Sequence, residues 1–131
     1  MADVAVSGVI KYWLPVLLYM ALLFVLSSQP SLPKPPGGLS NYHAHMAAYA
    51  GLAVTTLRAL AAGLRNPSWT AAWTAVAIAS LYGVSDEYHQ SFVPNRDADA
   101  LDLAADAFGS AVGAVAVKAW SIIGRRRCDA L

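Results

Sequence analysis

Four long apolar stretches divide this sequence, and short segments containing proline separate them. At 1.5 Å rise per residue, each stretch is about long enough to cross a hydrocarbon layer roughly 30 Å thick. Proline lacks the amide donor of a helix, so the segments between the stretches cannot continue them. We therefore predict an all-α integral membrane bundle of four transmembrane helices, at about 12–26, 41–64, 69–89 and 99–123.

The amino-acid composition is typical of an integral membrane protein. Of 131 residues, 57% are hydrophobic and 13% are charged, against about 45–50% apolar and about 25% charged in ordinary soluble domains. The length predicts a single domain spanning 1–131. The net charge of +1 and the lack of a basic stripe argue against nucleic-acid binding. A single cysteine, Cys128, allows neither an internal disulfide nor a cysteine-pair metal site.

Basic residues predict the orientation of the bundle. Short loops make successive helices antiparallel, which places both termini and the loop near Arg65 on one side. Only Lys34 and Arg96 lie on the other side, so the positive-inside rule makes both termini cytoplasmic. The cytoplasmic boundary also holds all four tryptophans, which favour membrane interfaces: Trp13, Trp69, Trp73 and Trp120.

Polar residues gather at the opposite, outward-facing end. In the second stretch Asn41, His45 and Tyr49 recur every four residues and form one stripe. The third stretch carries a helical face of polar residues flanked by Glu87 and Gln90: Tyr82, Ser85, Asp86 and His89.

The fourth stretch adds an acidic face, with Arg96 just before it. Asp99, Asp102 and Asp106 project on one side, and Gly109 and Gly113 continue that side inward, where small residues let another backbone approach. Carboxylates near hydrocarbon need a compensating cation, a shared proton, a metal ion or a wet cavity. The glycines could alternatively leave room for an acyl chain.

Several interpretations of this polar group remain open. It could be a buried network that holds the helices in register, or a ligand-binding or catalytic site. No compact signature such as H-E-x-x-H defines a metal site, and Ser85 lacks the nucleophile elbow of a serine hydrolase. Nitrogen and oxygen metal ligands are nevertheless plentiful: His45, His89, Asp86, Glu87, Asp102 and Asp106.

Three features of the chain carry a resemblance to a known family: the run SDEYHQSFVPNRDADALDLAADAFGS, the earlier SSQPSLP and a histidine-tyrosine pair that opens the second helix. From about Trp13 to Gly113, the chain resembles the VanZ-like family. The resemblance implies a small multi-pass protein of the bacterial inner membrane and cell envelope. The name-giving member confers antibiotic resistance by lowering susceptibility to the lipoglycopeptide teicoplanin. The family usually has an aspartate-lysine pair where this chain has Asn41 and Tyr42.

Two functions follow as hypotheses. The first is that the protein engages a cell-envelope lipid or lipoglycopeptide in an outward-facing polar cavity. The expected binding residues lie in the last three helices and in the loop between the third and the fourth: His45, Tyr49, Ser85, Gln90, Arg96, Asp102 and Asp106. The alternative is a membrane-embedded enzyme acting on a lipid-linked substrate, in which Glu87 or Asp86 and His89 act as general base and acid. The sequence leaves the question of catalysis, and of any cofactor, undecided.

Overall fold

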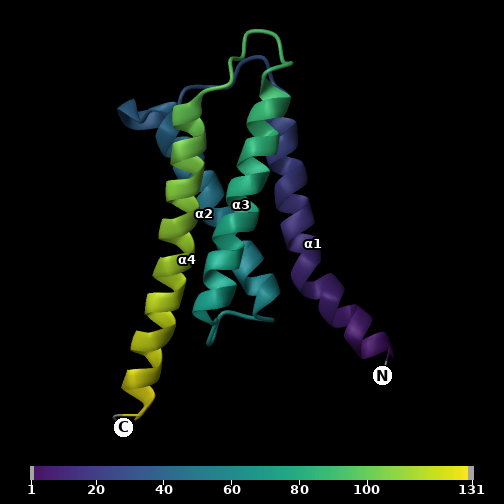
Figure 1. Ribbon diagram of the computed structural model, residues 1–131, viewed down its shortest axis with the longest axis vertical. Coiled ribbons are helices and arrows are strands. Elements are labelled where there is room, and N and C mark those ends of the chain that lie inside the picture. The colour runs from purple at the N-terminus through teal and green to yellow at the C-terminus, as the bar shows by residue number, and fades with distance from the viewer. Residues whose placement is uncertain (1, 130–131) are drawn as a thin grey trace.

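The computed structural model describes residues 2–129, and the described side chains are those of residues 6–125. Four α-helices make up the fold: α1 (Ala2–Ser27), α2 (Asn41–Leu60), α3 (Trp69–Gln90) and α4 (Ala100–Asp129). Figure 1 shows the helices running alternately up and down, with both ends of the chain at one end of the bundle and the α1–α2 and α3–α4 connections at the other. A short 3-10 turn, η1 (Pro36–Gly38), lies in the first connection.

Specific caps define the start of α3 and the end of α2. Ser68 caps α3 by accepting a hydrogen bond from the Ala71 amide at 2.9 Å. The second helix ends at Leu60, earlier than the predicted 64, because residues after it form a Schellman-type cap. In that cap the Gly63 amide donates to the Arg58 carbonyl at 2.9 Å, and Ala62 takes a positive φ of 50°.

Two other predicted limits were wrong. The first helix begins at Ala2 rather than near residue 12, because its first turns contain good or neutral helix formers and Gly8 alone is unfavourable. The fourth helix was expected to end at Gly124, yet it continues to Asp129. A single glycine costs only about 1 kcal/mol in a helix and arginine is a good helix former, so the helix passes through both.

The second and third helices each pack against the other three, and the contact of α2 with α4 is the most extensive in the bundle. Gly109 and Gly113 of α4 face the α2 backbone: a Cβ at Gly109 would overlap Met46, and one at Gly113 would lie 2.6 Å from the Ala50 carbonyl oxygen. The two glycines therefore serve the close helix approach expected of them. The alternative, that they leave room for an acyl chain, was wrong, because α2 fills that space.

Two segments are long and apolar enough to cross a membrane, Val6–Ser27 in α1 and Ala100–Arg125 in α4. The first is 11% buried over its most apolar window, so it is unlike the core helix of a soluble protein. Its outer face exposes large apolar side chains by 47–61%, as a lipid-facing surface would: Leu14, Leu17, Leu18, Leu22, Phe24 and Val25. Helices α2 and α3, which cover most of the predicted spans 41–64 and 69–89, do not meet the same criterion of length and hydropathy.

Substitution of Gly109 tests the close packing of α2 and α4. Gly109→Val should lower the free energy of unfolding by about 1–3 kcal/mol, the usual cost of overpacking a tight contact. Gly124→Ala is the matched control, because a Cβ there meets no atom within 4 Å, and it should be neutral or slightly stabilising. Thermal midpoints of the purified protein in detergent measure both; equal midpoints for Gly109→Val and the wild type would contradict the packing.

Candidate functional site

Four carboxylates are buried together at the end of the bundle where the two connections lie. Asp86 and Glu87 come from α3, and Asp102 and Asp106 come from α4; their exposed fractions are between 1% and 8%. Each of the four has one side-chain oxygen with no hydrogen-bond partner among the described residues. We call these four residues with His45 the acidic cluster. Such a density of buried acids is costly unless something balances it.

His45 of α2 is the basic side chain that contacts two of these acids. Its Nδ1 lies 2.8 Å from Asp106 Oδ1, and its Nε2 lies 3.5 Å from Asp102 Oδ2. Because an ionised carboxylate can only accept a hydrogen bond, Nδ1 carries the proton donated to Asp106. The imidazole therefore turns its other nitrogen toward Asp102.

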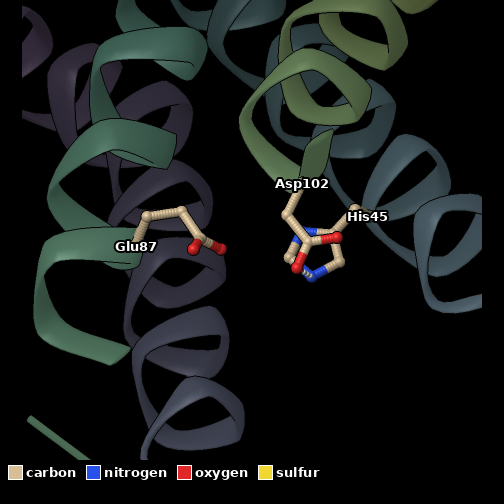
Figure 2. Close-up of side chains that lie close together, drawn as sticks. All are labelled: His45, Glu87 and Asp102. Carbon is tan, nitrogen blue, oxygen red and sulfur yellow. Dashed lines mark ion pairs between the residues drawn. The ribbon is translucent and has the colours of Figure 1, made fainter. Parts of the chain in front are cut away.

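Glu87 approaches the same point from the opposite side. Its Oε2 accepts a hydrogen bond of 3.0 Å from the Asp99 amide at the start of α4, while Oε1 has no described partner. Figure 2 shows the Glu87 carboxylate extending from α3 toward Asp102 and His45. Ligand-type atoms of these three residues all lie within 4.8 Å of one another.

Asp86 belongs to a second, hydrogen-bonded part of the cluster. Its Oδ2 accepts from Ser27 Oγ at 2.6 Å, from Tyr49 Oη at 3.3 Å and from Gln90 Nε2 at 3.3 Å. Gln90 in turn accepts a hydrogen bond of 2.7 Å from the Arg96 guanidinium. Residues from α1, α2 and α3 therefore meet at one carboxylate, and Gln90 links this group to Arg96 of the α3–α4 connection.

Two adjoining clefts open beside the cluster. A polar cleft of about 440 Å³ lies at the end of the bundle, lined among others by Asn41, Asp99 and Asp102. A mainly apolar cleft of about 190 Å³ runs between α1 and α2, and its walls include Leu23, Leu26, Ala44, Ala48 and Asp86. Leu32, Gln90 and Arg96 line both clefts, so the two are neighbours. Together they offer a polar compartment beside an apolar one.

The structure brings together most of the residues singled out from the sequence, with two exceptions. His89 stacks on Phe24 at 4.3 Å between ring centroids, and its Nε2 lies 2.9 Å from Ser28 Oγ, so it faces α1. Ser85 is exposed, and its hydroxyl donates to the Tyr82 carbonyl of its own helix. The buried face of α3 instead contains Gly83, Asp86, Glu87 and Gln90.

Sequence reasoning missed two contributors. Ser27 at the end of α1 is buried against Asp86, although only its place in the SSQPSLP run marked it. Tyr42 stands where the resemblance leads one to expect a charged pair, and its hydroxyl donates to Asp99 Oδ2 at 3.2 Å. The neutral tyrosine therefore still links the start of α2 to the start of α4.

These features define a small all-helical protein, rich in exposed apolar surface, with a buried acid–histidine cluster at one end. The chain belongs to the VanZ-like family, since the VanZ/LLP1 family model matches residues 12–122. Neither a curated protein nor a solved structure shows a significant match to this chain. Family membership and the two candidate spans together indicate a membrane protein.

Removal of the Ser27 hydroxyl tests the hydrogen-bonded part of the cluster. Ser27→Ala takes the shortest hydrogen bond from buried Asp86 and should lower the unfolding free energy by about 1–3 kcal/mol. In an Asp86→Asn background the same change should cost less, because a neutral amide needs fewer donors. Ser91→Ala, which alters an exposed hydroxyl bonded to its own helix, should stay within about 0.5 kcal/mol. Equal losses for Ser27→Ala in both backgrounds would disprove the coupling.

Proposed function

We propose that this protein is a multi-pass protein of the bacterial inner membrane that engages a cell-envelope lipid or a lipoglycopeptide at an outward-facing site. The observation that carries the proposal is the pairing of the polar and apolar clefts around Arg96. An amphiphile needs a polar compartment for its head group and an apolar wall for its chain. The guanidinium of Arg96 suits a phosphate or carboxylate in the head group.

Membrane placement in this proposal uses all four helices as spans. Support comes from the exposed apolar face of α1 and from the aromatic and basic residues near the chain ends. Trp69, Trp73 and Trp120 are 47–75% exposed, as interfacial tryptophans are. Buried Lys118 donates to the Pro67 carbonyl at 2.8 Å and lies 5.7 Å from the Trp69 ring, so this end is anchored by cations and indoles. The two termini are then cytoplasmic and the acidic cluster faces outward.

We propose that the ligand's acyl chain enters the apolar cleft laterally from the bilayer. Support comes from the apolar residues of α1 and α2 that line the cleft. We propose that binding at this position alters glycopeptide susceptibility of the teicoplanin type, which the family resemblance implies. A bound lipid or glycopeptide tail would lie against Leu23 and Leu26, with its head group near Arg96.

The alternative is a membrane-embedded enzyme acting on a lipid-linked substrate. It needs a general base and a general acid within reach of one substrate. Glu87 is available as a base through its unpartnered oxygen. His89, the acid proposed with it, contacts Phe24 and Ser28 instead, so the arrangement gives this alternative less support than ligand binding.

Cysteine labelling tests the topology. In a Cys128→Ser background, Lys34→Cys should react with a membrane-impermeant thiol reagent in intact cells, and Asn66→Cys should react only after the cells are opened. Both positions are exposed, so access depends on the membrane and not on the fold. The reverse labelling pattern would overturn the orientation.

Filling the apolar cleft tests the ligand site without touching its polar residues. Ala44 lines the cleft, and Ala44→Leu should exclude an acyl chain and weaken binding of a teicoplanin-type lipoglycopeptide by about tenfold or more, equivalent to about 1.4 kcal/mol. Ala47→Leu is the matched control, because Ala47 is also exposed on α2 but lies outside the cleft.

The measurements are binding of labelled lipoglycopeptide to the protein in nanodiscs and the inhibitory concentration of teicoplanin in a host that expresses each variant. Wild type and Ala47→Leu should bind alike and change susceptibility alike, while Ala44→Leu should lose both effects. An unchanged susceptibility on expressing the wild type would refute the glycopeptide role, and wild-type binding by Ala44→Leu would refute the cleft.

A further inference from the structure

We propose that His45, Glu87 and Asp102 form a binding site for a divalent transition-metal ion such as Zn²⁺. The inference is independent of the proposed lipid or glycopeptide ligand. It rests on the geometry of the three side chains, on their unpartnered oxygens and on the residue that orients the imidazole.

The three side chains converge from three different helices. Their ligand-type atoms lie within 4.8 Å of one another, and His45 Nε2 lies 3.5 Å from Asp102 Oδ2. Ligands held about 2.0–2.1 Å from a tetrahedral zinc ion lie roughly 3.3 Å from each other. The 3.5 Å pair is therefore close to the spacing of two ligands on one ion. The Glu87 carboxylate extends toward the same two side chains (Figure 2).

Two buried carboxylate oxygens without hydrogen-bond partners are a second observation, besides the acidity of the cluster, that indicates a ligand. Glu87 is 3% exposed and its Oε1 has no described hydrogen-bond partner; Asp102 is 8% exposed and its Oδ1 also has none. A buried carboxylate oxygen without a donor is costly, so native proteins usually satisfy it. A cation bound between the two carboxylates would give both buried groups a positively charged partner.

Asp106 supplies the outer-shell interaction that metal-bound histidines usually make. Its Oδ1 accepts the hydrogen bond from His45 Nδ1 at 2.8 Å, which leaves the Nε2 lone pair directed toward Asp102. Metal-ligating histidines almost always donate their second ring nitrogen to a carboxylate or carbonyl in this way. Asp106 is 1% exposed and therefore positions the imidazole rigidly.

Charge and access favour the same assignment. Asp86, Glu87, Asp102 and Asp106 carry more negative charge than His45 and Arg96 can offset, and a divalent ion would reduce that excess. One imidazole with two carboxylates suits zinc-like ions better than Mg²⁺, which prefers oxygen ligands alone. Asp102 also lines the polar cleft, so an ion could enter from that side and keep an open coordination position toward it.

The test uses the full chain in detergent, with a purification tag free of histidine and all metal removed by a chelator. After addition of Zn²⁺ and gel filtration, metal analysis should find about one ion per chain, and Co²⁺ should give the visible absorption of a tetrahedral site with a nitrogen ligand. Mg²⁺ in excess should not displace either ion.

Variants separate the site from general surface binding. Glu87→Gln and Asp102→Asn should each weaken Zn²⁺ binding by at least about 100-fold, and Asp106→Asn, which acts through His45, by about 10–100-fold. Asp97→Asn removes an exposed carboxylate at the same end and should bind as the wild type does. Helical circular dichroism and elution volume establish that each variant is folded.

Three results would overturn the proposal. The first is that the wild-type chain retains no Zn²⁺ and gives no Co²⁺ band. The second is that the Glu87→Gln and Asp102→Asn variants are folded and both bind Zn²⁺ as the wild type does. The third is that Asp97→Asn loses as much Zn²⁺ binding as Glu87→Gln and Asp102→Asn do. None of these measurements uses the lipoglycopeptide, so the metal site can fail while the ligand cleft stands, or the reverse.

Discussion

The close approach of α2 and α4 brings the histidine of the acidic cluster against two of its carboxylates. Gly109 and Gly113 let the α2 backbone reach α4 at Met46 and Ala50. His45 precedes Met46 by one residue, and Asp106 precedes Gly109 by three, so the helix contact brings the imidazole against the carboxylate. Larger residues at the two glycines would separate the helices and, with them, the histidine from its acids.

The cost of burying four carboxylates explains how the rest of this end is built. Asp86 is balanced by hydrogen bonds from Ser27, Tyr49 and Gln90, whereas Asp102 and Asp106 depend on His45. The two parts differ in character. The first part ties three helices together through hydrogen bonds to one oxygen of Asp86, and the second is held by the single imidazole of His45. In both parts each carboxylate keeps one oxygen without a hydrogen-bond partner among the described residues.

The first helix contributes to both the apolar and the polar part of the site. Its outer face is apolar and largely exposed, and its last residue, Ser27, donates a hydrogen bond to Asp86 of the acidic cluster. Tyr82 of α3 donates to the Met20 carbonyl of α1 and Tyr19 of α1 donates to the Ala48 carbonyl of α2, so hydroxyl groups attach α1 to the bundle. Helix α1 thus forms one wall of the apolar cleft and also completes the polar site.

The sequence by itself determined the four helices, the connections that separate them and the end of the bundle at which polar residues gather, because proline breaks and apolar length are local properties. It also placed Asp102 and Asp106 on one face of a helix, which the 3.6-residue period requires. Only the tertiary structure decided that His45 joins these acids while His89 turns to α1 and Ser85 to the surface. Periodicity fixes which residues share a face, but the rotation of each helix about its axis is set by packing against its neighbours. In α4 this is the contact of Gly109 and Gly113 with α2, and in α3 it is the approach of Gly83 to Tyr49 and Asp106.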